Sequence, residues 1–234
     1  MAGQSVEDAV SSTERSEADR VTDVARKPKE VLEFLEIQAG MKVLDLFSGG
    51  GYYTEIIARA VGEHGVVVAH NNQAYIDYAA ESLGGRFSEG RLTNVERILA
   101  EANELVLPAN SFDAALVMLT WHDFYYVDEE NGWPEIDQGL VVGELCSALK
   151  PGAILGLTDH VALSGTNPSV TAQELHRIDP EQIRKDLESG CFHFEGELDA
   201  LRNTEDDLTQ PMFAEGIRGK TDRVVYKFRK VAAE

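Results

Sequence analysis

Residues 43–51 read Val-Leu-Asp-Leu-Phe-Ser-Gly-Gly-Gly, an apolar run that passes into a cluster of glycines. Such a short apolar run, bounded by glycines, is typical of a buried β-strand, which we expect to end near Phe47. Apolar residues then recur at helical spacing from Tyr52 to Val61. A glycine loop between a strand and a helix lets the backbone approach a ligand, and the helix N-terminus offers unpaired amides. The run therefore predicts a binding site for a phosphate or a carboxylate.

On both sides of this loop, strand and helix patterns alternate along the chain. Besides residues 43–47, apolar runs predict strands at 66–69, 95–100, 112–119, 153–158, 192–198 and 223–229. Helical spacing or end signals predict helices from Pro28 and at 52–61, 75–83, 139–149 and 180–189. This alternation predicts an α/β fold, with a seven-stranded, mostly parallel sheet, an antiparallel last strand and helices on both faces. Residues 25–234 would form one domain. Residues 1–24 are polar and predict a flexible tail or a loosely docked helix.

The net charge is −20, from 41 acidic and 21 basic side chains among 234 residues. Such a charge repels phosphate backbones and anionic membranes, so we expect no nucleic-acid partner and no membrane contact. A small molecule or a basic partner fits better, although the charge could serve solubility alone. No apolar run approaches the ~20 residues that span a bilayer, and residues 1–20 lack the apolar core of a secretory signal. A cytoplasmic location is the default prediction, and a homodimer is possible.

The chain has two cysteines, Cys146 and Cys191. They form neither a CxxC pair nor a Cys/His cluster with zinc spacing. Each lies in an apolar stretch, so we expect two reduced thiols in the core.

The glycine loop resembles motif I of class I S-adenosylmethionine-dependent methyltransferases, in which an acidic residue is followed by alternating glycines. Asp45, Gly49 and Gly51 match this motif, whereas Phe47 stands where glycine is usual. The resemblance implies a Rossmann-like fold in which the backbone from Gly49 to Gly51 faces the methionine part of S-adenosylmethionine. We also assign Asp45, Phe47 and Tyr53 to this cofactor site.

Folds of this kind commonly carry an acid after the second strand, where it binds the ribose hydroxyls. This chain has Asn72 there, whose amide offers both a donor and an acceptor. The missing acid also argues against an NAD-dependent oxidoreductase. Glu101 and Ala102 resemble the third-strand motif that receives the adenine amino group, although Glu101 could be a solvated helix residue. Together with Thr120, these residues complete the predicted cofactor site.

The fourth predicted strand runs into Trp121-His122-Asp123-Phe124-Tyr125. In the fold implied by the resemblance, this junction lies beside the transferred methyl group. His122 is the candidate general base, because the unperturbed pKa of histidine is close to physiological pH. Asp123 could orient it or bind a cationic substrate. The aromatic residues could shield the sulfonium or simply belong to the core.

His160 follows the fifth strand and is a second candidate acid or base. It could also be a metal ligand, and His122, His160 and His176 could converge. Because sequence alone does not show whether they do, we assign no metal site.

Several segments of the second half sharpen the resemblance: Thr-Asp-His at 158–160, Ser-Gly-Thr at 164–166, Leu-His-Arg-Ile-Asp-Pro at 175–180 and Ile-Arg-Gly-Lys-Thr-Asp-Arg at 217–223. Together with residues 28–32 and 121–125, they resemble a bacterial family of predicted methyltransferases over roughly residues 26–230. This resemblance implies the class I fold and S-adenosylmethionine, but no particular substrate. Some members of that family carry export signals, and no such signal is recognisable in residues 1–20.

Five basic residues in the second half of the chain stand out in so acidic a protein: Arg177, Arg202, Arg218, Lys220 and Arg223. They could neutralise a substrate carboxylate. Alternatively, they could form a structural network of ion pairs with Asp179, Asp207 and Asp222.

We therefore expect a methyltransferase that transfers a methyl group to an oxygen or nitrogen of a small-molecule substrate. His122 would remove the proton, helped by Asp123 or His160. The alternative is a non-catalytic or regulatory protein of the same fold that binds S-adenosylmethionine or S-adenosylhomocysteine, and Phe47 and Asn72 motivate it.

Overall fold

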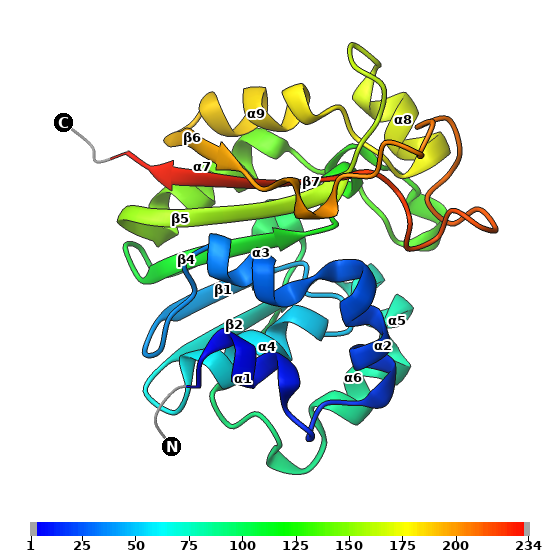
Figure 1. The fold of residues 1–234 in the computed structure, drawn as a ribbon. Helices are drawn as coiled ribbons and strands as arrows, with labels where there is room; N and C mark the ends of the chain where they lie inside the picture. The colour runs from blue at the N-terminus through cyan, green and yellow to red at the C-terminus, as the bar shows by residue number, and fades with distance from the viewer. Residues whose placement is uncertain (1–3, 232–234) are drawn as a thin grey trace.

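The computed structural model describes residues 4–231, apart from the side chain of Glu89. Its centre is one seven-stranded sheet in the order β3-β2-β1-β4-β5-β7-β6 (Figure 1). The strands are β1 (Lys42–Leu46), β2 (Val66–Asn71), β3 (Val95–Leu99), β4 (Phe112–Met118), β5 (Leu149–His160), β6 (Phe192–Glu197) and β7 (Arg223–Lys230). Strand β7 runs antiparallel to both neighbours, and β1 to β5 are mutually parallel. The predicted mostly parallel sheet with an antiparallel last strand is confirmed.

Helices cover both faces of the sheet (Figure 1). The α-helices are α1 (Val6–Ser11), α2 (Glu17–Arg26), α3 (Pro28–Phe34), α4 (Tyr52–Val61), α5 (Gln73–Tyr78), α6 (Ala80–Arg86), α7 (Gln138–Ala148), α8 (Pro168–Leu175) and α9 (Pro180–Glu188). Short 3-10 helices are η1 (Ser88–Gly90), η2 (Ala102–Glu104), η3 (His122–Tyr125), η4 (Glu129–Asn131) and η5 (Asp199–Leu201). None of the helices in the described part of the chain is long and apolar enough to cross a bilayer.

The side chains of strand β4 pack into two separate hydrophobic cores, one on each face of the sheet. Ala115 and Val117 pack into the core under α7 and α9, whereas Ala114 and Leu116 pack into the core under α1, α3 and α4. Because successive strand side chains point to opposite faces, a continuous apolar strand serves both cores at once.

The N-terminal segment differs from the flexible tail that its polarity predicts. Within residues 4–26, helices α1 and α2 pack on the domain, and Val6 and Ala9 are buried. Arg15 is also buried, and it donates two hydrogen bonds of 2.7 Å to the carboxylate of Asp23. Arg86 and Arg59, which lie outside the segment, pair with Asp19 at 2.7 Å and Glu14 at 2.6 Å, so ion pairing helps to dock a segment that has too few apolar residues to be recognised as structured.

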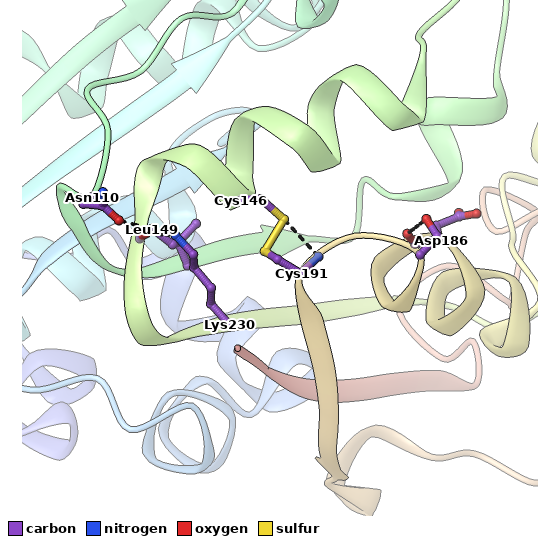
Figure 2. The surroundings of a disulfide bond; sticks show 7 residues. Asn110, Cys146, Leu149, Asp186, Cys191 and Lys230 are labelled. Carbon is purple, nitrogen blue, oxygen red and sulfur yellow. Dashed lines mark hydrogen bonds between the residues drawn. A yellow bond between two sulfur atoms is a disulfide. The ribbon is translucent and has the colours of Figure 1, made fainter. Parts of the chain in front are cut away.

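The two cysteines also differ from the prediction, since Cys146 and Cys191 form a disulfide bond (Figure 2). It joins α7 to the turn between α9 and β6, where the two Cα atoms lie 5.8 Å apart. The expectation of reduced thiols is wrong because 45 residues separate the pair in the sequence, and the packing of α7 against α9 brings them together.

Candidate functional site

A cavity of about 650 Å³ opens where the glycine loop, β4 and β5 end. Such a volume is ordinary for a small-molecule site, and ligands of open α/β sheets bind at the carboxyl ends of the strands. Helix α2 forms its roof, and the segment ahead of β7 closes one side. Its lining includes Asp19, Thr22, Ala25, Arg26, Phe47, Ser48, Gly49, Gly50, Tyr75, Leu119, Thr120, Asp123, Tyr126, Trp133, His160, His176, Phe213, Arg218 and Arg223.

The glycine loop takes a left-handed backbone conformation at three positions. Gly49 and Gly51 have φ values of 54° and 78°, and Phe47 has a φ of 52°. Non-glycine residues rarely adopt this conformation, so position 47 shows why glycine is usual in the motif. The Phe47 ring is held by packing against Tyr75 and Phe124, with ring centroids 5.2 and 5.3 Å away. Aromatic packing thus offsets the backbone strain.

Asn71, which the sequence does not single out, fixes the middle of the loop. Its Oδ1 accepts a hydrogen bond from the Gly49 amide at 2.8 Å, and its Nδ2 donates to the Gly49 carbonyl at 3.0 Å. The only signal in the sequence is a side-chain amide at the end of a buried strand.

Of the predicted cofactor residues, Phe47, Gly49 and Thr120 line the cavity. The others, which are Asp45, Gly51, Tyr53, Asn72, Glu101 and Ala102, are not among its lining residues. Asp45 is buried below the loop and accepts a 2.5 Å hydrogen bond from Thr54, and burial raises its pKa to about 6. Burial likewise raises the pKa of Tyr53 to about 12.

Asn72 and Glu101 lie at the carboxyl ends of β2 and β3. Asn72 caps α5, because its Oδ1 accepts from the amide of Tyr75 at 3.0 Å. Glu101 Oε1 accepts from the amide of Gln73 at 3.3 Å, whereas Oε2 is buried and has no hydrogen-bond partner in the described chain.

Several buried polar atoms near the cavity lack hydrogen-bond partners within the described residues: Ser48 Oγ, Thr120 Oγ1, Glu101 Oε2 and Arg223 Nε. A buried polar group without a partner is costly, and such groups mark places where a polar ligand binds. Hydroxyl, carboxylate and guanidinium groups match the hydroxyls, amino groups and carboxylate of S-adenosylmethionine. A Cβ at Gly49 would meet no atom within 4 Å, so the loop leaves open space there. The residues present therefore fit the cofactor that the resemblance implies.

His122 does not line the cavity but lies directly behind it. Its Nδ1 is 2.7 Å from Asp159 Oδ1, and its backbone amide donates to Asp159 Oδ2 at 2.8 Å. Its Nε2 lies 3.2 Å from Asp123 Oδ1. Burial disfavours the charged imidazole, but the carboxylates of Asp123 and Asp159 outweigh it and raise the pKa of His122 well above its usual range.

Asp123 and His176 stand between His122 and the cavity, and both line it. Asp123 Oδ2 accepts a short hydrogen bond from the hydroxyl of Tyr75, and Asp123 Oδ1 is 3.7 Å from His176 Nδ1. Burial raises the pKa of Asp123, but the charge of His122 outweighs it and leaves that pKa well below its usual range.

His160 lines the cavity on the β5 side. Its Nδ1 lies 2.7 Å from Thr221 Oγ1, and burial followed by the charge of His122 lowers its pKa well below the usual range. The rings of His160 and His176 lie 5.9 and 5.6 Å from that of His122. The three histidines therefore do converge.

The aromatic residues after β4 belong mainly to the core. Trp121 and Phe124 are fully buried, and the Trp121 indole and the Tyr125 hydroxyl both donate to Asp186. The aromatic wall of the cavity is made by Tyr126 from this segment and by side chains from other segments, which are Phe47, Tyr75, Tyr78, Trp133 and Phe213.

Four of the five basic residues singled out in the second half divide into two groups, and Lys220 belongs to neither. Arg177 is buried and pairs with Asp206 at 2.8 Å, and Arg202 pairs with Asp222 at 2.9 Å, so both are structural. Arg218 and Arg223 line the cavity together with Arg26 from the roof.

Comparison with known proteins agrees with this geometry. A family profile described as a methyltransferase domain matches residues 37–216, most of the chain. The chain is 38% identical over 82 residues to the ubiquinone/menaquinone biosynthesis C-methyltransferase UbiE of Cronobacter sakazakii, covering 35% of this chain and 32% of that protein. It is 31% identical over 135 residues to the demethylmenaquinone methyltransferase of Listeria monocytogenes, covering 56% and 49%. The match thus spans about a third to a half of the length of these curated relatives.

Solved structures share the fold at low sequence identity. A SAM-dependent methyltransferase from Aquifex aeolicus superposes with a TM-score of 0.60 at 21% identity, covering 90% of this chain and 98% of that one. Geranyl diphosphate C-methyltransferase from Streptomyces coelicolor, in complex with S-adenosyl-L-homocysteine, gives 0.62 at 14%, covering 98% and 92%. Fold, glycine loop and profile agree: the chain belongs to the methyltransferase domain family of class I S-adenosylmethionine-dependent methyltransferases, with S-adenosylmethionine as its cofactor.

Proposed function

We propose that the protein transfers a methyl group from S-adenosylmethionine to an oxygen or nitrogen of a small-molecule substrate that carries an anionic group. The observation that carries this proposal is the cavity itself, because the glycine loop and the polar side chains Asp123, His160 and His176 line the same space. A nucleophile held by these side chains would lie beside a cofactor held by the loop.

Bound S-adenosylmethionine supplies an electrophilic methyl group on a sulfonium. The tasks of the chain are then to hold the nucleophile in line and to keep water out. Helix α2 covers the cavity, and Arg86 ties this roof to the loop, since it donates to Asp19 and to the Gly50 carbonyl at 2.7 Å each. The aromatic wall supplies apolar surface beside the reacting groups.

The polar groups that reach the nucleophile are Asp123, His160 and His176, each of which can accept a hydrogen bond from an O–H or N–H group. His122 has a different role from the one its sequence context suggests. Because it lies behind Asp123 and is held by Asp159, we assign it as a positioning residue.

We propose that the substrate carries an anionic group because three guanidinium groups line the cavity, those of Arg26, Arg218 and Arg223. Within the described residues, none of the three forms a salt bridge with a carboxylate, and Arg223 Nε is buried without a partner. One of them can meet the carboxylate of the cofactor, which leaves two for an acidic substrate. All three lie outside residues 37–216, so the family match does not cover these groups.

The test has two stages. Calorimetry on protein stripped of ligands measures S-adenosylmethionine binding, and no heat at millimolar ligand would refute its use here. Methyl-labelled cofactor is then incubated with hydroxy and amino acids, aryl acids and their neutral esters, with carbon acceptors included because the curated relatives are C-methyltransferases. We expect label in O- or N-methylated acids, little in the esters, and a loss of at least about tenfold in Arg218→Ala.

The alternative is a protein of this fold that binds the cofactor without transferring its methyl group. Its support is Asn72, which is engaged as the cap of α5 and brings no acid to the ribose position. Cofactor binding without transfer to any acceptor would favour this alternative. The absence of a nucleic-acid partner and a cytoplasmic location stay predictions from composition, and a homodimer stays a prediction.

A further inference from the structure

Three side chains beside the cavity place their ligating atoms together. His122 and Asp123 come from η3, and His176 ends α8. One ligating atom from each of the three side chains lies within 4.8 Å of the other two. Asp123 Oδ1 is 3.2 Å from His122 Nε2 and 3.7 Å from His176 Nδ1. Ligands bound at about 2.0–2.2 Å from one ion are about 3–4 Å apart, so this spacing suits a metal centre.

The second observation is that His122 Nε2 has no hydrogen-bond partner among the described residues, although the side chain is only 1% exposed. Asp123 is near enough for an ion pair, but the geometry does not make a hydrogen bond. A buried ring nitrogen aimed at a carboxylate and another imidazole is what a metal ligand requires.

The groups behind the cluster orient its members. Asp159 binds the far nitrogen of His122, which is the carboxylate–histidine arrangement that commonly supports a metal-bound imidazole. The Tyr75 hydroxyl binds Asp123 Oδ2 and leaves Oδ1 for the ion. The His176 ring lies between Tyr126 and Phe213, with centroids 4.9 and 5.1 Å away.

One side of the cluster is open to the reaction space. Asp123 and His176 both line the cavity, whereas His122 closes the buried side. Three protein ligands and one open position are the pattern of catalytic rather than structural metal sites.

We propose that His122 Nε2, Asp123 Oδ1 and His176 Nδ1 bind one divalent transition-metal ion of the zinc type, with its open position facing the cavity. Two imidazoles and one carboxylate suit such ions better than Mg²⁺ or Ca²⁺, which prefer oxygen ligands. In methyl transfer the ion would hold an ionised oxygen of the substrate beside the cofactor, and His122, Asp123 and His176 would then act through the ion instead of contacting or positioning for the nucleophile directly. That use rests on the proposed function, whereas binding of the ion does not.

The experiment titrates chelator-treated full-length protein with ZnCl₂ in a calorimeter, without cofactor or substrate, and follows Co²⁺ binding by its visible absorption. We expect one ion per chain. His176→Ala should lower the affinity at least about 100-fold, because even loss of a supporting group costs 10–100-fold. Asp159→Asn, which removes the carboxylate that supports His122, should lower the Zn²⁺ affinity by about 10–100-fold. His193→Ala, which removes an exposed histidine from β6, is the matched control and should bind as the unaltered protein does.

Equal Zn²⁺ affinity in the unaltered protein and in His176→Ala, or no stoichiometric binding in either, would overturn the proposal. Circular dichroism melting checks that each variant is folded. The His176 side chain is 24% exposed, so its loss should leave the fold intact. Because no methyl transfer is measured, a failure of metal binding is distinguishable from a failure of the proposed function.

Discussion

The side chain of Asn71 makes two hydrogen bonds to the backbone of Gly49: its Oδ1 accepts from the Gly49 amide at 2.8 Å, and its Nδ2 donates to the Gly49 carbonyl at 3.0 Å. We predict that Asn71→Ala lowers the affinity for S-adenosylmethionine about 10- to 100-fold, because two hydrogen bonds worth about 1 kcal/mol each hold the loop. Calorimetry measures the effect.

Asn94→Ala is the matched control for this variant. The Asn94 amide donates two bonds of 2.8 and 2.9 Å to the carbonyls of Ala58 and Gly62, away from the cavity. It should lose similar stability and keep its cofactor affinity. Equal affinity in the two variants would contradict a role for Asn71 in holding the loop.

Asp45 makes folding depend on pH. Burial raises its pKa to about 6 in the folded protein, from an ordinary 3.8. The folded state therefore binds this proton more tightly than the unfolded state, and the contribution to stability is lost as pH rises from about 4 through about 6. Asp45→Asn should increase the free energy of unfolding at pH 8 by up to about 3 kcal/mol, with the difference disappearing near pH 4. Urea unfolding across this pH range measures it.

Asp113→Asn provides a control of opposite sign. Burial raises the pKa of Asp113, but the hydrogen bond from Lys150 outweighs it and lowers that pKa. This variant should lose stability at pH 8 and approach the unaltered protein as pH falls. The same pH dependence in both variants would refute the burial of charge at Asp45.

The disulfide between Cys146 and Cys191 closes a loop of 45 residues. Loop entropy gives it an upper contribution of about 4 kcal/mol, and typical values are about 2–4 kcal/mol. We expect the double variant Cys146→Ala/Cys191→Ala to melt roughly 5–15 °C lower by calorimetry. A reductant should lower the melting temperature of the unaltered protein to the same value and leave the variant unchanged. A reductant effect on the variant would point to some other cause.

The roof depends on Asp23, which receives two hydrogen bonds from Arg15 and one of 2.5 Å from the hydroxyl of Tyr52. Asp23→Ala should speed amide exchange across α2 at least about tenfold, because bonds to charged groups contribute about 1.5–3 kcal/mol each. Hydrogen exchange read by mass spectrometry follows α2, with β4 as the internal reference. Glu7→Ala, which removes only an exposed ion pair to Lys29, should leave α2 unchanged, and protection of α2 in Asp23→Ala would argue against this anchor.

The sheet could be predicted because continuous apolar runs have few other structures to adopt, and the glycines after β1 fixed the position of the cofactor loop. The helix after β2 was less predictable. Gly84 and Gly85 suggest an end to it, yet both lie inside α6, which continues to Arg86. Both glycines are exposed, and Arg86 at the end of α6 donates to Asp19 and to the Gly50 carbonyl, so contacts of Arg86 outweigh the low helix propensity of glycine there.

The candidate site was only partly predictable from the sequence, because residues that contact one another in it lie far apart along the chain. His122 and Asp123 adjoin the end of a buried strand, and their location follows from that strand. Asp159, which orients His122, and His176, which faces Asp123, come from elements 37 and about 50 residues further on. No local pattern encodes such pairings. The cytoplasmic location also stays untested, and disulfide bonds are uncommon in a reducing cytosol.

The bounds of the family match divide the residues that line the cavity into two sets. The roof helix α2 and the guanidinium groups of Arg26, Arg218 and Arg223 all lie outside residues 37–216, whereas the glycine loop lies within them. The part of the cavity that would hold the cofactor is thus covered by the family match, whereas the part that would bind an anionic group of a substrate is built from segments outside it.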